Sequence, residues 1–144
     1  MPFYNKINNA SPEGRRTAEG LLRLRKALDD AVPQRTLDQT LLLASWNIRE
    51  FGGNKSGGRE EEALYYLAEV ISRFDLVTVP EVRDNLDALD GLMYILGRPW
   101  RYLVSDVTFG TSGNNERLAY VYDERKLSFG GLVGELVPPM TKKG

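Results

Sequence analysis

Residues 41–48 read LLLASWNI and residues 74–81 read FDLVTVPE, and these two apolar runs decide the fold. Each run is short and rich in aliphatic side chains, which is typical of a strand buried on both faces. Between them, residues 60–74 place apolar side chains at helical spacing: Leu64, Leu67, Ala68, Ile71 and Phe74. A strand, a helix and a second strand in this order predict a right-handed crossover between parallel neighbours.

The flanking sequence predicts further elements around this unit. Ser11 and Pro12 form a helix start, followed by a stripe of Leu21, Leu24, Leu28 and Val32. The basic side chains on the other face of this helix indicate a solvated surface. Asn85 is predicted to cap a third helix that ends at Gly97, and strands are expected over 100–107, 118–122 and 127–137.

Composition restricts the chemistry that the chain can perform. Its 144 residues are 42% hydrophobic, enough for one domain with a core, and 19 basic against 20 acidic residues give a net charge of -1. The sequence has neither cysteine nor histidine. Thiol nucleophiles, zinc-thiolate sites and imidazole bases are therefore excluded, and catalysis has to use carboxylates, amides and hard metal ions. No apolar run approaches the roughly 18 residues of a membrane span, so we expect a soluble, cytoplasmic protein.

Two polar residues follow the two deciding runs. Asn47 comes after the first run and Glu81 closes the second. Catalytic groups of open α/β sheets collect beyond the carboxyl ends of strands, and Mg²⁺ takes one or two carboxylates with water and phosphate oxygens. The alternative for each is an ordinary surface residue. Two other features favour structural interpretations: 52–58 as a glycine-rich loop without P-loop spacing, and 60–62 as acidic residues that begin a helix.

Three segments together resemble a known superfamily. Residues 45–49 read SWNIR, residues 75–85 read DLVTVPEVRDN, and residues 114–122 read NNERLAYVY. In this order and spacing they resemble the first three motif blocks of the DNase I-like endonuclease/exonuclease/phosphatase superfamily, over residues 41–137. The resemblance implies an α/β (α+β sandwich) fold: the N-terminal half of a four-layer α/β/β/α sandwich, with a mixed sheet and flanking helices. Residues 1–40 would be a helical extension and 41–144 a partial domain.

The resemblance also implies roles for individual residues. Glu81 matches the glutamate that binds Mg²⁺ (or Mn²⁺), and Asn47 matches the asparagine that supports the metal and the scissile phosphate. Arg83 matches an arginine that contacts the substrate strand, its alternative being a surface ion pair with Asp84 or Asp87. Glu116 matches the acidic residue that orients a catalytic histidine. The implied substrate is DNA or another phosphate ester.

The sequence departs from the family pattern in two respects. Pro80 replaces the usual glutamine before the metal-binding glutamate, which removes an amide and a backbone donor. The second-half motifs, including the catalytic histidine, do not occur in the 144 residues. We therefore expect a magnesium-dependent phosphodiesterase whose catalytic C-terminal half is absent, so that the chain alone is inactive. The alternative is a non-catalytic half-domain that self-associates or pairs with a complementing half.

Overall fold

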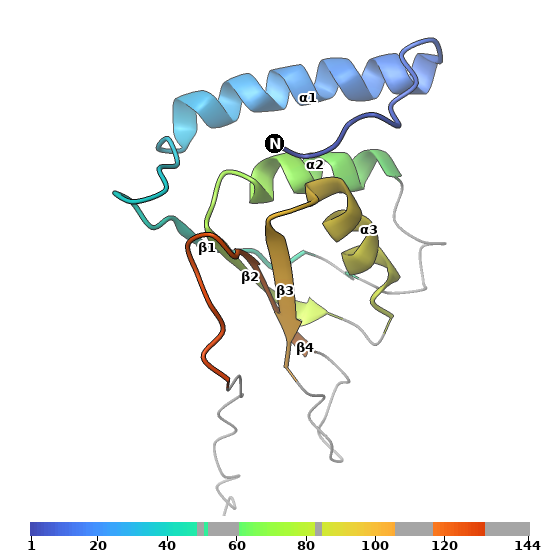
Figure 1. Cartoon of the computed structure of the whole chain (residues 1–144). Helices are drawn as coiled ribbons and strands as arrows, with labels where there is room; N and C mark the ends of the chain where they lie inside the picture. The colour runs from blue at the N-terminus through green and yellow to red at the C-terminus, as the bar shows by residue number, and fades with distance from the viewer. Residues whose placement is uncertain (49–50, 52–60, 83–84, 106–116, 132–144) are drawn as a thin grey trace, which may run out of the picture.

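The computed structural model describes residues 1–48, 51, 61–82, 85–105 and 117–131. It contains three helices and four strands in the order α1, β1, α2, β2, α3, β3, β4. Figure 1 shows a layered arrangement, in which α2 and α3 lie against the sheet and α1 lies across the outer side of α2. Within these ranges, no helix is both long and apolar enough to cross a membrane.

The strands form one mixed sheet in the order β1-β2-β4-β3. β1 (Leu43–Ser45) runs parallel to β2 (Leu76–Val82), with Leu43 opposite Leu76 and Ser45 opposite Thr78. β4 (Arg117–Asp123) runs antiparallel both to β2 and to β3 (Trp100–Val104). The predicted parallel crossover and the mixed sheet with flanking helices are confirmed.

The start of α1 and the end of α3 agree with the sequence signals, whereas Asn85 is not the cap of α3: Leu86 occupies the N-cap position and makes no side-chain cap hydrogen bond. α1 (Pro12–Ala31) is capped by the Ser11 hydroxyl, which accepts a hydrogen bond from the Gly14 N–H at 3.0 Å. α2 spans Glu61–Ile71 and α3 spans Asp87–Leu96. Gly97 follows α3 with a φ of 63°, a left-handed conformation that glycine adopts without steric cost.

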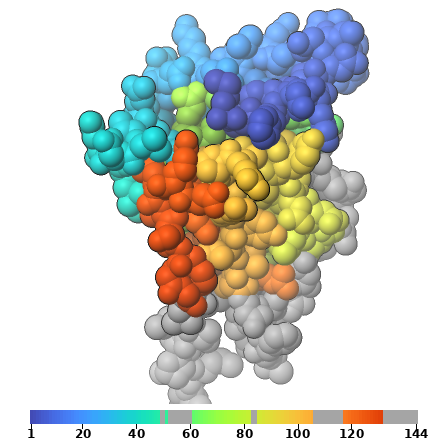
Figure 2. Space-filling view, viewed as in Figure 1, coloured from blue at the N-terminus to red at the C-terminus, as the bar shows by residue number. Residues whose placement is uncertain are grey.

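The core lies between α2, α3 and one face of the sheet. Its sheet side is formed by alternate residues, among them Val77, Val79, Ala119 and Val121, each at most 1% exposed. Leu67, Ala68 and Ile71 of α2 and four residues of α3 complete it: Leu89, Leu92, Ile95 and Leu96. In Figure 2 the N-terminal segment lies against the residues of α3 and β3.

Two predictions about strands are wrong. Neither run is a strand buried on both faces: β1 has three residues with Leu43 58% exposed, and in β2 alternate residues are buried while Leu76 and Thr78 are only partly so. β1 is an edge strand, and the described helices cover one face of the sheet. A strand was also predicted over 127–137, whereas 127–131 has no strand, and 132–137 lies outside the described residues. The glycines at 130 and 131 disfavour a strand there.

Candidate functional site

The carboxyl ends of β1 and β2 form the candidate site. The two strands are parallel neighbours, and the Trp46 N–H donates to the Thr78 carbonyl oxygen at 2.9 Å just past the end of β1. Asn47 follows immediately, and Glu81 is the next-to-last residue of β2. Both residues are exposed. The two runs therefore lie side by side in one sheet, with Asn47 and Glu81 at the same edge, as predicted.

Glu81 lies in a β-bulge. Val79 pairs with Ala119 and Val82 pairs with Arg117, so three residue steps on β2 oppose two on β4. Glu81 takes a φ of 62°, the left-handed region that a side chain other than glycine rarely adopts. Such backbone conformations cost roughly 1–3 kcal/mol and cluster at functional sites. The bulge thus holds an exposed carboxylate between two core positions of its strand.

Pro80 explains part of this geometry. A proline cannot donate to a sheet ladder, so within sheets it occurs at edges, strand starts and bulges. In β2 it directly precedes Glu81, inside the interval where the register with β4 shifts. The missing amide donor is therefore accommodated by the bulge. The sequence contained this signal, because a proline inside an otherwise regular strand pattern favours a bulge over an unbroken ladder.

The donor atoms at this edge suit a hard cation. The Glu81 carboxylate and the Asn47 amide oxygen are ligand types that Mg²⁺ accepts, and Mg²⁺ retains several waters when few protein ligands are present. Among the described residues, no group of three acidic, histidine or cysteine side chains is arranged to hold a metal ion. The described residues therefore contain no complete ligand set at this end of the sheet. Arg83 and Glu116, the other two predicted site residues, lie outside the described residues.

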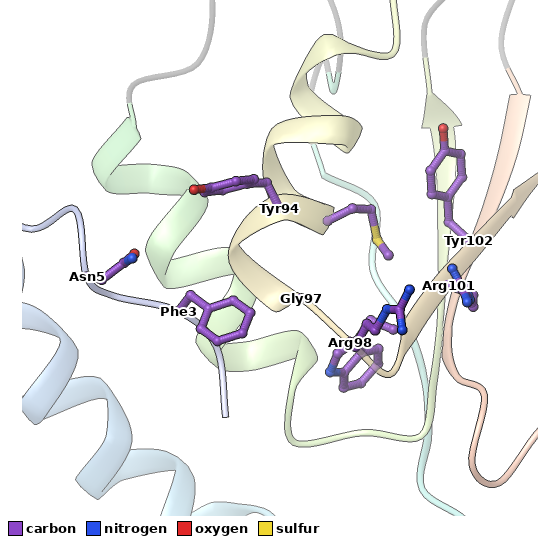
Figure 3. A pocket seen from close by; sticks show the side chains of 9 residues that line it. Phe3, Asn5, Tyr94, Gly97, Arg98, Arg101 and Tyr102 are labelled. Atoms are coloured by element: carbon purple, nitrogen blue, oxygen red, sulfur yellow. The ribbon is translucent and has the colours of Figure 1, made fainter.

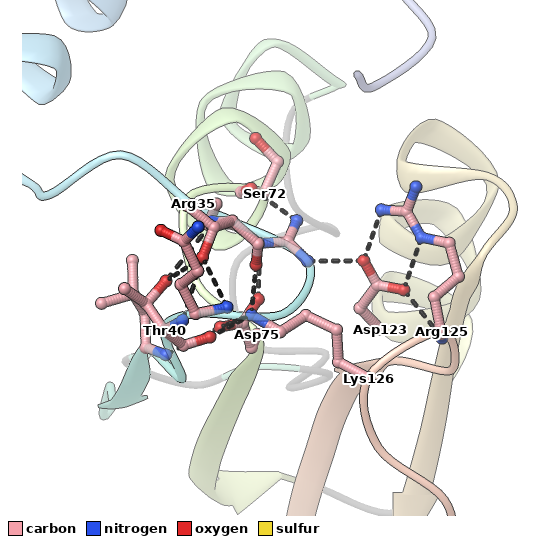
Figure 4. Close-up of polar contacts among 10 residues, drawn as sticks. Arg35, Thr40, Ser72, Asp75, Asp123, Arg125 and Lys126 are labelled. Carbon is pink, nitrogen blue, oxygen red and sulfur yellow. Dashed lines mark hydrogen bonds and ion pairs between the residues drawn. The ribbon is translucent and has the colours of Figure 1, made fainter.

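A buried ion-pair network occupies the opposite end of the sheet (Figure 4). Asp75 precedes β2 and Asp123 closes β4, and neither is exposed. The Arg35 guanidinium bridges them, with Nε 2.7 Å from Asp75 and a terminal nitrogen 2.5 Å from Asp123. The Lys126 ammonium lies 2.7 Å from Asp75, and Arg125 binds Asp123. The network therefore fixes the segment before β1 and the turn after β4 to the sheet.

The network also sets the charge state of its carboxylates. Burial alone would raise the pKa of Asp75, but hydrogen bonds from Lys126, the Leu42 N–H and Arg35 outweigh it and lower that pKa. The pKa of Asp123 is lowered in the same way against the effect of burial, mainly by Arg125. Both groups are thus held as carboxylates by partners that the fold brings to them, which indicates a structural role for this end of the sheet.

A second buried carboxylate fastens α1 to α2. Glu69 of α2 is 3% exposed and binds Arg25 of α1 at 3.0 Å and Arg73 at 2.9 Å. The Tyr4 hydroxyl also donates to it. Burial would raise the pKa of Glu69, but hydrogen bonds from Arg25, Tyr4 and Arg73 lower it to about 2.

The sequence analysis identified neither of these clusters. Asp75 and Glu69 appear in the sequence as single acidic residues within apolar patterns. This pattern indicates that each carboxylate has a partner, but it does not identify the partner residue.

Known relatives support the resemblance. No protein-family model matches the chain. Deoxyribonuclease-1 of Rattus norvegicus is 33% identical over 97 residues, which cover 64% of the chain and 33% of the relative. Deoxyribonuclease-1 of Homo sapiens is 30% identical over 120 residues, which cover 80% of the chain and 39% of the relative. The chain thus spans between a third and two fifths of the length of these relatives. Sequence similarity and a mixed sheet with flanking helices together identify the chain as related to the DNase I-like nucleases.

Proposed function

We propose that the chain carries part of a magnesium- or manganese-dependent phosphodiesterase site of the deoxyribonuclease type. The observation that carries the proposal is the exposed Glu81 carboxylate, held in a strained bulge at the end of β2, while Asn47 follows the same end of its parallel neighbour β1. A strained backbone at a surface carboxylate is hard to explain by stability, because it costs free energy without burying the side chain. The strained backbone is explained if catalysis requires the Glu81 carboxylate to be held in this position.

Each predicted residue has a defined task in this proposal. Glu81 and the Asn47 amide oxygen would hold the cation, which when bound supplies positive charge to the phosphoryl oxygens. Arg83 would bind a substrate phosphate through two N–H donors of its guanidinium group. Glu116 would orient a histidine that activates water, and the 144 residues contain no histidine. The substrate class is inferred from the relatives, which are deoxyribonucleases: DNA, or a phosphate ester of similar charge.

Cation binding can be tested on this chain without any turnover. We expect a Mn²⁺ titration followed by NMR to broaden the amide signals of residues 46–48, 79, 81 and 82; Pro80 has no amide proton. Glu81→Gln keeps the size of the side chain and removes its charge, so it should weaken the broadening about tenfold or more. The matched control is Glu124→Gln, which neutralises an exposed carboxylate just beyond β4, at the opposite end of the sheet. Broadening centred elsewhere, or unchanged in Glu81→Gln, would contradict the assignment.

Catalysis is tested separately by nicking of supercoiled plasmid DNA across a magnesium titration. Because the chain has no histidine to serve as base, we expect the 144 residues alone to give no chelator-sensitive nicking. In a longer DNase I-like protein that carries this sequence, Glu81→Ala should lower the rate about a hundredfold or more and leave the fold intact. Near-normal nicking by that variant would remove Glu81 from the site.

A further inference from the structure

A cleft of about 710 Å³ lies between the N-terminal segment, the end of α3 and the start of β3 (Figure 3). Clefts of this size are in the range that small ligands occupy. Trp100, which opens β3, pairs with Asp123 at the end of β4, so the cleft is at the end of the sheet opposite to Asn47 and Glu81. Nothing assigned above uses it. It is lined by Phe3, Asn5, Met93, Tyr94, Gly97, Arg98, Trp100, Arg101 and Tyr102.

The cleft is built by a specific contact between the N-terminal segment and the turn after α3. The Phe3 N–H donates to the Ile95 carbonyl oxygen at 2.6 Å. The Phe3 ring lies directly against Gly97, where an added Cβ would come within 2.0 Å of a ring carbon. A side chain at position 97 would therefore displace the ring. Because Gly97 leaves this space free, Phe3 forms one wall of the cleft.

The walls combine aromatic rings with positive charge. Phe3, Tyr94, Trp100 and Tyr102 contribute rings, and the guanidinium groups of Arg98 and Arg101 lie on the β3 side (Figure 3). The nine lining residues include no carboxylate.

Arg98 is the guanidinium left for a ligand. Arg101 donates from Nε to Glu124 at 2.6 Å, so part of its charge is already compensated. Arg98 is exposed, and in the described part of the chain no hydrogen bond or ion pair is recorded for it. A third cation stands close by, since the Lys6 ammonium lies 4.2 Å from the centre of the Tyr94 ring. The cleft therefore favours a ligand that joins an anionic group to a flat apolar body.

We propose that this cleft binds a nucleoside phosphate, as a free mononucleotide or as one unit of a single strand. The base would stack on the exposed ring of Phe3 or on the face of the Tyr94 ring that Lys6 does not occupy, and the phosphate would pair with Arg98. Stacking on an aromatic side chain and charge-assisted pairing with arginine are the two interactions by which proteins hold unpaired nucleotides. The proposal is independent of the metal site, because neither interaction needs a bound metal ion.

Calorimetric titration of the whole chain in EDTA tests the proposal with three probes: dAMP, a thymidine hexanucleotide and deoxyribose 5-phosphate. We expect dAMP or the hexanucleotide to bind with a dissociation constant below about 1 mM. Binding of both indicates a mononucleotide site, and binding of the hexanucleotide alone indicates a single-strand site. Deoxyribose 5-phosphate should bind about tenfold more weakly than the better probe, because it has no base to stack.

Substitutions inside and outside the cleft test whether the nucleotide binds there. Arg98→Glu should weaken the better probe about tenfold or more, and Tyr94→Ala about fivefold. The control Arg23→Glu makes the same charge change at an exposed arginine of α1, outside the cleft, and should change the affinity less than twofold. The proposal is overturned if neither nucleotide probe binds, if the sugar phosphate binds equally well, or if Arg23→Glu weakens binding as much as Arg98→Glu.

Discussion

At the scale of single residues, Asp75 shows how one buried carboxylate organises a large part of the chain. It accepts hydrogen bonds from the Leu42 N–H at 2.7 Å, from Arg35 and from Lys126. Lys126 is itself only 5% exposed and also donates to the carbonyl oxygens of Thr36 and Thr40. Removing Asp75 would therefore leave a nearly buried ammonium without a carboxylate.

Asp75→Ala is predicted to destabilise the fold by about 3–5 kcal/mol, because breaking one side of a buried ion pair leaves an uncompensated charge. The comparison is Glu124→Ala, which breaks an exposed pair with Arg101 and should cost less than about 1 kcal/mol. Urea unfolding of both variants measures the difference. Equal losses would show that the network contributes no more than an ordinary surface pair.

Individual residues were predictable to very different degrees. The positions of Asn47 and Glu81 at the carboxyl ends of two neighbouring strands could be predicted, because each residue lies at the end of an apolar run, which is information local in the sequence. Arg35 was not, since its partners Asp75 and Asp123 are 40 and 88 residues away and are brought together only by the sheet order. The positive φ of Glu81 was also missed, although Pro80 before it favoured a bulge.

At the scale of helices and strands, the start of α1 and the end of α3 were the most predictable features, because Ser11 and Gly97 are signals that lie within a few residues of these helix ends. The interpretation of residues 41–48 failed for the opposite reason. An apolar run does not tell how many faces of a strand are covered, and the described helices cover only one. The packing of α1 could not be predicted from the sequence either, because the position of α1 on α2 depends on Glu69 and the residues that bind it.

The attachment of α1 is predicted to depend on pH. A carboxylate whose folded pKa is about 2, against about 4.5 when unfolded, stabilises the fold above pH 4.5 and loses this effect as the pH falls toward 2. We expect Glu69→Gln to remove about 2–4 kcal/mol of stability near neutral pH and much less at pH 2. The two unfolding curves, measured from pH 7 to pH 2, should therefore converge. A constant gap across this range would show that the Glu69 charge is not responsible.

At the scale of the whole molecule, one face of the sheet stays free of the described helices. The register places Leu43, Leu76, Tyr122 and Arg101 in one row across it, and Ser45, Thr78, Tyr120 and Leu103 in the next. These rows carry three leucines and two tyrosines, of which Leu43 is 58% exposed and the other four are partly buried. Apolar faces of this kind drive association of proteins in water.

We predict that the 144-residue chain associates at micromolar concentration, and that Leu43→Lys or Tyr120→Lys shifts it toward the monomer. Leu22→Lys is the control, because Leu22 is 65% exposed on α1, the helix that packs on α2. Light scattering over a concentration series gives the mass. A monodisperse monomer at all concentrations would refute the prediction, as would an equal effect of Leu22→Lys.

The strained bulge at one end of the sheet and the ion-pair network at the other also have an evolutionary consequence. The residues that position Glu81 share no hydrogen bond or ion pair with Asp75 or Asp123 among those described. Substitutions far apart, with no common partner, usually act additively. During evolution, the side chains at positions 47 and 81 could therefore be replaced and give a new specificity. The stability that the ion-pair network contributes, and with it the tolerance to mutation, would be unchanged.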